Sequence, residues 1–158
     1  MKKISILLLT TIMAITLTGC RNNISTTDAI TSKICTIKQN GIEQTYKYTA
    51  TNDEIDKVEL TMVYDNSLFG VETLSTLTES QKEQITTEML NSLELESTTY
   101  EGLDINIDIQ DQMKVNLKAD LTKANPEILK KVGLDFTDAD MNLERTVEDM
   151  TDAGAVCK

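Results

Sequence analysis

The residue with the clearest chemistry is Cys20, which ends the run Leu17-Thr18-Gly19-Cys20. A leucine three residues before a cysteine, with two small residues between them, is typical of a lipobox, where a lipoprotein precursor is cleaved and its cysteine receives a diacylglyceryl group. Two acyl chains are enough for stable anchoring in a membrane, whereas a single chain is marginal. The pattern predicts lipidation of Cys20; the alternative is an ordinary cysteine behind an ordinary signal peptide.

The residues around this cysteine favour the lipoprotein interpretation. Lys2 and Lys3 give a positive start, and residues 4–17 are an apolar stretch shorter than the roughly 20 residues that span a bilayer. We therefore expect residues 1–19 to be a signal peptide, residues 20–32 to be a polar, flexible tether, and residues 33–158 to be a single domain. The expected location is the extracytoplasmic face of the cell membrane.

The two other cysteines, Cys35 and Cys157, lie close to the two ends of the predicted domain. Extracytoplasmic thiols usually pair, and this spacing excludes a Cys-x-x-Cys redox centre or a zinc knuckle. We predict a disulfide between them, with two unpaired thiols as the alternative.

Few other residues favour catalysis or cofactor binding. The chain has no histidine, which excludes Ser-His-Asp and Cys-His mechanisms and removes the commonest zinc ligand. Its six glycines form no phosphate-binding loop. We predict no catalytic residue, no metal site and no cofactor.

Two groups of acidic residues offer an alternative to the prediction that the chain has no catalytic residue and no metal site. Asp104 and Asp108 point the same way from one strand, with Asn106 between them, and could form an acid–base pair, although charged residues on a solvent-facing strand are equally well explained. The run 138–144 resembles the start of a calcium loop. Leu143 occupies the position that needs glycine and Asp149 stands where glutamate is expected, so these acids suit a helix N-terminus better.

Three tyrosines, Tyr46, Tyr48 and Tyr64, could form a platform on which a ligand stacks. Their strand-like spacing favours instead a place in the core, with the hydroxyls at its rim.

The charge of the chain limits its partners. It carries 15 basic and 26 acidic residues, and loss of the signal peptide removes two lysines, which changes the formal charge from −11 to −13. Such a charge disfavours nucleic acid and anionic lipid surfaces. We expect membrane contact through the lipid on Cys20 alone.

The elements that position these residues follow from periodicity. Residues 34–64 alternate like strands around Asn40-Gly41, a strong hairpin signal, and predict a three-stranded meander. Residues 65–77 read as a connection. Residues 78–93 predict a helix with a capping box, and residues 103–121 alternate like a second hairpin.

The last third of the chain predicts two further helices and a return to the sheet. Asn125-Pro126 opens a short helix that ends at Gly133, and a final helix is expected over residues 138–152 with Thr137 as its cap. Residues 155–157 then reach the sheet edge. The predicted fold class is α+β: an antiparallel sheet in the order β-β-β-α-β-β-α-α with helices packed on one face.

With these residues in view, the chain resembles the YehR-like bacterial lipoproteins, a family whose domain has no assigned function. The resemblance lies in the lipobox at Cys20, the hairpin from Asn40-Gly41 to Tyr48, the hairpin 102–121 and the terminal helix with Gly154-Ala155-Val156, and covers residues 33–158. It implies a membrane-attached α+β domain without catalytic residues. The Cys157 ending departs from the family pattern, so the resemblance does not support the disulfide.

Two classes of function remain open at this point. The preferred one is a non-enzymatic binding or interaction module of the cell envelope, whose partner is an envelope protein or a small ligand. The alternative is a small hydrolase or metal-binding protein that uses carboxylates alone. An enzyme needs a concave site that gathers two or more acids, whereas a binding module needs only a suitable surface.

Overall fold

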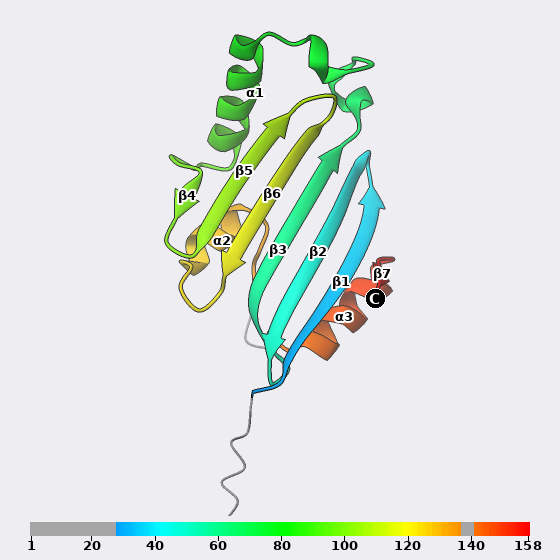
Figure 1. Ribbon diagram of the computed structural model, residues 1–158, viewed down its shortest axis with the longest axis vertical. Coiled ribbons are helices and arrows are strands. Elements are labelled where there is room, and N and C mark those ends of the chain that lie inside the picture. Colours follow the sequence, from blue (N-terminus) through cyan, green and yellow to red (C-terminus); the bar gives the residue numbers. More distant parts are fainter. Residues whose placement is uncertain (1–27, 137–140) are drawn as a thin grey trace, which may run out of the picture.

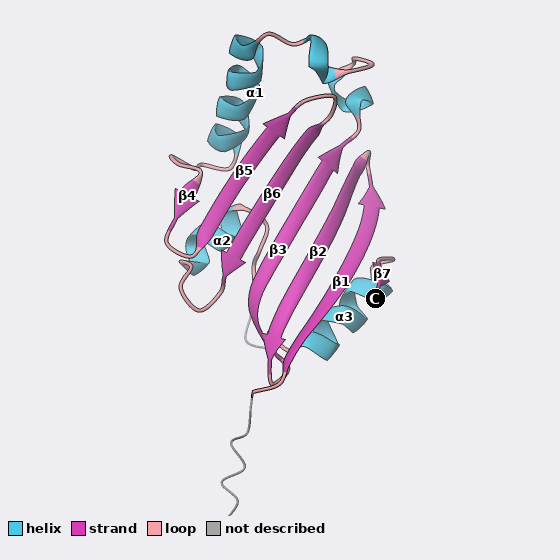
Figure 2. Cartoon of the chain, viewed as in Figure 1, coloured by secondary structure: helices cyan, strands magenta, loops and turns pink. Residues whose placement is uncertain are grey.

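The computed structural model describes residues 28–136 and 141–158, which form one seven-stranded antiparallel sheet with three α-helices (Figures 1 and 2). The strand order across the sheet is β4-β5-β6-β3-β2-β1-β7. The elements are β1 (Ile30–Gln39), β2 (Ile42–Thr51), β3 (Glu54–Tyr64), α1 (Glu79–Ser92), β4 (Thr99–Tyr100), β5 (Leu103–Ile109), β6 (Met113–Asp120), α2 (Pro126–Lys131), α3 (Leu143–Asp152) and β7 (Val156–Cys157). The α+β fold with helices packed against an antiparallel sheet is confirmed.

The meander β1-β2-β3 is formed by two tight turns. Asn40 and Gly41 adopt φ of 51° and 77°, and Asn52 and Asp53 adopt φ of 52° and 68°. Two consecutive left-handed residues match the right-handed twist of the flanking strands, which is why Asn, Asp and Gly are favoured there. The expected meander and its Asn40-Gly41 turn are confirmed.

One face of the sheet forms the core. Side chains of β2, β3, β5 and β6 alternate between buried and solvent-facing positions, as in a sheet with one covered face. Helices α2 and α3 lie behind the sheet in Figure 1 and cover this face. The side chains that are almost completely buried include Ile55, Val58, Leu74, Leu103, Met113, Val115 and Leu117.

The helix α1 lies alongside the upper part of β5 (Figure 1). Its expected capping box is present: the Thr78 side chain accepts a bond from the Gln81 backbone N–H, and Gln81 bonds back to Thr78. Its apolar side chains, among them Ile85 and Met89, are only partly buried against the core. α1 is thus an edge element rather than a part of the central layer.

The short helix α2 forms as expected. The Asn125 side chain accepts a bond from the Glu127 backbone N–H, and Pro126 occupies the first turn. Gly133 follows with φ of 78°, the left-handed conformation that ends a helix.

The expected start of the last helix is wrong. α3 begins at Leu143 with Asn142 as its cap, whose side chain accepts from the Arg145 backbone N–H. Residues 141 and 142 are instead held as an extension of the sheet, because the Ile55 N–H donates to Met141 and Asn142 forms a bridge with Glu54. Residues 137–140, including the expected cap Thr137, lie outside the described part of the chain.

Two further differences concern strands. β1 starts at Ile30, so three residues assigned to the tether belong to the sheet. The two-residue strand β4 was not expected.

Within the described residues, no helix is both long and apolar enough to cross a membrane.

Candidate functional site: the open face of the sheet

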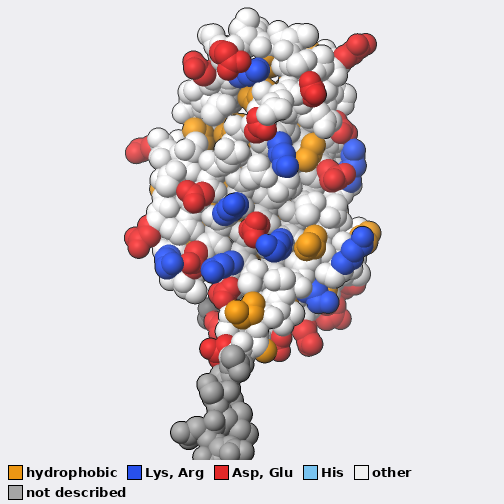
Figure 3. Space-filling model, in the orientation of Figure 1, with side chains coloured by type: hydrophobic (Ala, Val, Ile, Leu, Met, Phe, Trp, Pro, Cys, Tyr) orange, Lys and Arg blue, Asp and Glu red, His pale blue; other side chains and the backbone are white. Residues whose placement is uncertain are grey.

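Among the elements that the structure describes, no helix covers the face of the sheet opposite α2 and α3, and this face is exposed to solvent (Figures 1 and 3). Its side chains are the ones that alternate with the core positions. We use the term open face for these side chains, which form four rows across neighbouring strands. The first to fourth rows are, in order, Lys38–Glu43–Val63–Lys114–Asp108, Thr36–Thr45–Thr61–Asn116–Asn106, Ile34–Lys47–Glu59–Lys118–Asp104, and Ser32–Thr49–Lys57–Asp120. Basic and acidic side chains are interspersed across it in Figure 3.

The third row alternates in charge, and Lys47, Glu59, Lys118 and Asp104 are called the charged row below. Lys47 Nζ lies 2.6 Å from Glu59 Oε1 and donates a hydrogen bond to it. This bond, with the positive charges of Lys47 and Lys118, lowers the pKa of the Glu59 carboxyl. Lys118 and Asp104 form no ion pair within the described part of the chain, so one cation and one anion stay available to a partner.

The second row is uncharged and hydrogen-bonded across strands. The hydroxyls of Thr36 and Thr45 lie 3.2 Å apart, and the Thr61 hydroxyl donates to Asn116 Oδ1 at 3.0 Å. These bonds fix the side chains of the row and leave its amide groups facing solvent. A partner that docks here meets ordered donors and acceptors.

A hollow of about 570 Å³ lies over the middle of these rows. It is lined by Glu59, Thr61, Asp104, Ile105, Asn106, Asn116, Leu117 and Lys118. Its lining combines the charges of Glu59, Asp104 and Lys118 and the two amides with apolar surface, including Ile105 and Leu117. The hollow therefore offers charged and hydrogen-bonding groups beside apolar surface.

The expected acid–base candidates are not brought together by the strand geometry. Asp104 and Asp108 lie in different rows of β5, and four residues of strand separate their Cα atoms by roughly 13 Å. Glycosidase carboxyl pairs lie about 5–9.5 Å apart. The hollow does gather Glu59 and Asp104, but a general acid needs a raised pKa, and that of Glu59 is lowered.

Metal-binding residues do not gather in the described part of the chain, where no group of three or more Cys, Asp or Glu side chains is placed to hold an ion. Asp138 and Asp140, from the calcium-like run, lie outside it. Asp149 instead lies 3.8 Å from Arg145, one turn away on α3.

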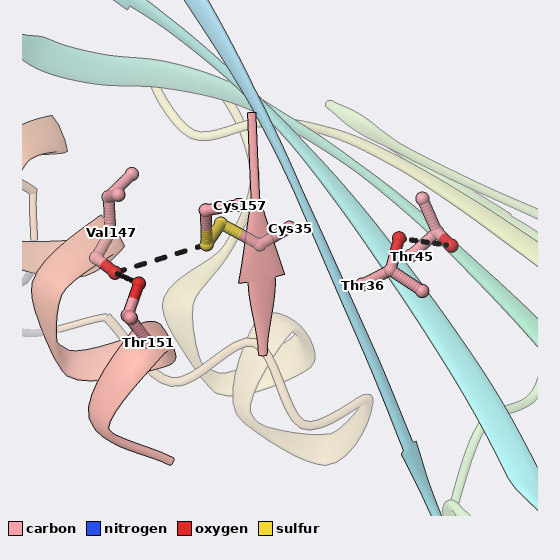
Figure 4. Close-up of a disulfide and its surroundings, with 6 residues drawn as sticks. All are labelled: Cys35, Thr36, Thr45, Val147, Thr151 and Cys157. Atoms are coloured by element: carbon pink, nitrogen blue, oxygen red, sulfur yellow. Dashed lines mark hydrogen bonds between the residues drawn. A yellow bond between two sulfur atoms is a disulfide. The ribbon is translucent and has the colours of Figure 1, made fainter. Parts of the chain in front are cut away.

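The disulfide between Cys35 and Cys157 is present, which confirms that expectation (Figure 4). The two cysteines are direct cross-strand partners of β1 and β7, with Cα atoms 4.0 Å apart. Cys35 is completely buried, and Cys157 Sγ lies 3.9 Å from the Val147 carbonyl oxygen of α3. The bond therefore holds the end of the chain against the core face of the sheet edge.

The three tyrosines lie on the core face of the sheet. The rings of Tyr46 and Tyr48 stack with centroids 5.9 Å apart, and Tyr48 is only 2% exposed. Burial raises the pKa of the hydroxyl of Tyr46, Tyr48 and Tyr64. These rings pack with the core, as their spacing favoured, although Tyr46 and Tyr48 also border a small hollow beside α3.

Sequence reasoning found only part of this face. It singled out Asp104 and Asp108 but not Lys47, Glu59 or Lys118, because a row forms only when the register between strands is known. The alternation of β3 and β6 predicted which side chains share a face, but not which of them are neighbours. Cys20, the remaining candidate, lies outside the described residues.

Comparisons with known proteins support the fold. No protein-family model matches the chain, and no curated protein matches it. The solved structure of the YehR protein of E. coli is similar, with a TM-score of 0.62, 18% identity, and coverage of 83% of this chain and 92% of that one. A Streptococcus pneumoniae TIGR4 protein is similar with a TM-score of 0.52, 10% identity and coverage of 100% and 98%. At these identities the likeness shows a shared fold.

Proposed function

We propose that this protein is a lipid-anchored, extracytoplasmic lipoprotein that acts as a non-enzymatic binding module of the cell envelope, with the open face as its binding surface. The YehR-like family named from the sequence fits this proposal, because the fold of E. coli YehR is shared. The lipid on Cys20 provides attachment, and the folded domain provides recognition.

The observation that carries the proposal is the disulfide between Cys35 and Cys157. Disulfides persist in oxidising compartments and are rare in the cytosol, where thiols are kept reduced. A structural disulfide supports export, and export is what the lipobox at Cys20 predicts independently. Nine residues, 21–29, separate that cysteine from β1, and the stretch from Cys20 to Ile30 spans at most about 35 Å, so the domain would stay close to the bilayer.

Binding rather than catalysis is supported by the open face. Its charges are paired or balanced by neighbours, and Glu59 is held as a carboxylate by Lys47. The two carboxylates of the hollow, Glu59 and Asp104, have Lys118 between them in the charged row. Such a surface offers charge and hydrogen-bond complementarity to a partner, which gives specificity.

The anchoring step is tested with Cys20→Ala and, as a matched control, Cys157→Ala, each expressed from the full-length gene. We expect Cys20→Ala to lose both fatty-acid labelling and membrane retention, because the acidic surface has no other affinity for lipid. Cys157→Ala should keep both, since it removes a cysteine that carries no lipid. Unchanged retention of a cleaved Cys20→Ala protein would refute the anchor.

The binding step is tested on the same membranes with a mild amine-reactive crosslinker. We expect the full-length protein to give discrete crosslinked adducts that Lys118→Glu reduces and Lys130→Glu, on the helical side, does not. Adducts of equal yield in all three proteins would show that the open face is not the binding surface.

A further inference from the structure

The open face differs in charge from the rest of the protein. The whole chain carries 15 basic and 26 acidic residues. The four rows of the open face, however, contain five lysines (Lys38, Lys47, Lys57, Lys114 and Lys118) and five acids (Glu43, Glu59, Asp104, Asp108 and Asp120). The net negative charge therefore lies on the other surfaces, and these repel a second copy of the same chain. The open face is the surface across which two copies meet without net repulsion.

The order of charges in the charged row adds a geometric condition. Along the strands β2, β3, β6 and β5 the row reads Lys47, Glu59, Lys118, Asp104, so its sign alternates from strand to strand. A two-fold axis parallel to the strands and between β3 and β6 exchanges β2 with β5 and β3 with β6. Lys47 then faces Asp104 of the second copy, and Glu59 faces its Lys118. Every member of the row meets the opposite charge.

The neighbouring rows agree with this axis. In the fourth row Lys57 on β3 faces Asp120 on β6 of the second copy, which again joins opposite charges. In the second row Thr61 faces Asn116, which offers a hydrogen bond instead of a charge. The same axis thus matches three of the four rows.

The first row, at the far end of the face, contains one unfavourable pair. There Glu43 faces Asp108, but each has a lysine as its direct cross-strand neighbour, Lys38 beside Glu43 and Lys114 beside Asp108. The adjacent lysines reduce the repulsion between these carboxylates.

The alternative two-fold axis, perpendicular to the strands through the second row, is disfavoured by the same charges. Rotation about this axis places each strand opposite the same strand of the second copy, and the first row opposite the third row of that copy. Lys118 would then face Lys114, and Asp104 would face Asp108. Like charges directly opposite each other are destabilising, so the charge pattern selects the axis parallel to the strands.

We propose that the open face binds a second copy of this chain, in a face-to-face dimer whose two-fold axis runs parallel to the strands between β3 and β6. Five strands at about 4.8 Å and four rows at about 6.7 Å give a contact of roughly 650 Å² per copy. The total of roughly 1,300 Å² is at the low end of specific interfaces. The dimer is accordingly weak in solution, and confinement of both copies to one membrane would strengthen it.

This inference rests on the binding surface of the proposed function but not on its lipid anchor. The test uses the full-length protein in detergent, with two affinity tags so that mixed pairs are detected. The dimer contains two equivalent contacts between position 59 of one copy and position 118 of the other. Lys118→Glu alone places two carboxylates opposite each other at both contacts. Glu59→Lys alone places two ammonium groups opposite each other at both contacts. We expect each variant to self-associate at least roughly tenfold more weakly than the unaltered chain in sedimentation velocity.

Mixing the two variants gives the deciding result. In a mixed pair, each contact between positions 59 and 118 joins opposite charges again, so co-expressed Lys118→Glu and Glu59→Lys chains should be recovered together at close to the unaltered yield. A defect within one folded chain would not be repaired by mixing. Lys130→Glu on α2, which reverses a charge away from the open face, is the matched control and should leave dimerisation unchanged.

Several outcomes would overturn the inference. The first is that the unaltered chain stays monomeric up to millimolar concentration and at the membrane. The second is that the mixed variants fail to associate although both show unaltered thermal melting. The third is that neither variant weakens the dimer. If either variant fails to fold, Lys47→Glu mixed with Asp104→Lys applies the same test at the other pair. A dimer that persists in Cys20→Ala, or an anchored protein that stays monomeric, separates this inference from the proposed anchor.

Discussion

Removal of the bond between Cys35 and Cys157 should lower stability while leaving the sheet in place. Two changes achieve this: a reductant added to the unaltered chain, and the substitution Cys157→Ala. The second is preferred over Cys35→Ala because Cys35 is completely buried and its truncation would add a cavity to the loss of the bond.

The magnitude follows from the length of chain that the bond closes. The two cysteines are 122 residues apart, for which the chain-entropy relation gives about 5 kcal/mol at 25 °C as an upper value. β7 is further held by two backbone bonds between Ile34 and Lys158, of 3.1 and 2.8 Å, and Ala155 remains buried. We therefore expect a loss of about 2–5 kcal/mol, or roughly 10 °C in Tm.

The assay is urea unfolding of the full-length chain, followed by circular dichroism with and without reductant. The double variant Cys35→Ala/Cys157→Ala is the control, and reductant should not change its midpoint. An unchanged midpoint of the unaltered chain on reduction would refute the reasoning, and so would two free thiols in protein recovered from the cell surface. Complete loss of the sheet signal on reduction would show that the core depends on the bond.

Three other changes have defined outcomes. Gly102→Ala should destabilise by about 3 kcal/mol or more in urea unfolding, because its Cβ would lie 2.5 Å from the Ala124 backbone nitrogen at φ of 71°; Gly133→Ala, at φ of 78° in open space, should cost only about 1 kcal/mol. Burial raises the pKa of the Tyr48 hydroxyl in the folded chain. The buried, uncharged hydroxyl therefore contributes to stability below pH 10, and this contribution is lost as the pH rises above that value. Ultraviolet titration should show ionisation of Tyr48 together with alkaline unfolding. Millimolar calcium should not raise Tm, and a rise that is absent with magnesium and absent in Asp140→Ala would show that residues 138–144 bind the ion.

Apart from the pairing of Cys35 with Cys157, the parts of the fold that the sequence predicted correctly are local ones. Asn40-Gly41, the Thr78 capping box and the Asn125-Pro126 helix start each act within a few residues, so their physics is contained in a short segment. Alternation in β5 and β6 likewise reports which side chains share a face.

The incorrect start of α3 has a non-local cause. Asp138 and Asp140 suit the first turn of a helix, and nothing within residues 137–142 contradicts that pattern. The helix begins later because β3 pairs with the chain at Met141 and Asn142. A contact with a segment about 90 residues earlier in the chain overrides the local preference. A short window of sequence does not contain that contact.

The open face has the same non-local origin, which explains why its charge pattern is visible only in the folded chain. β3 and β6 are neighbours although α1, β4 and β5 lie between them in sequence, and this pairing sets Glu59 beside Lys118. A shift of one residue in this register would turn one of the two strands over, so that either Glu59 or Lys118 would move to the buried face. The charged row therefore depends on the same register as the core row of Leu60 and Leu117 behind it. One pairing thus positions both a packed core row and an ordered charge pattern, so a variant that alters the open face without disturbing Leu60 and Leu117 separates recognition from folding.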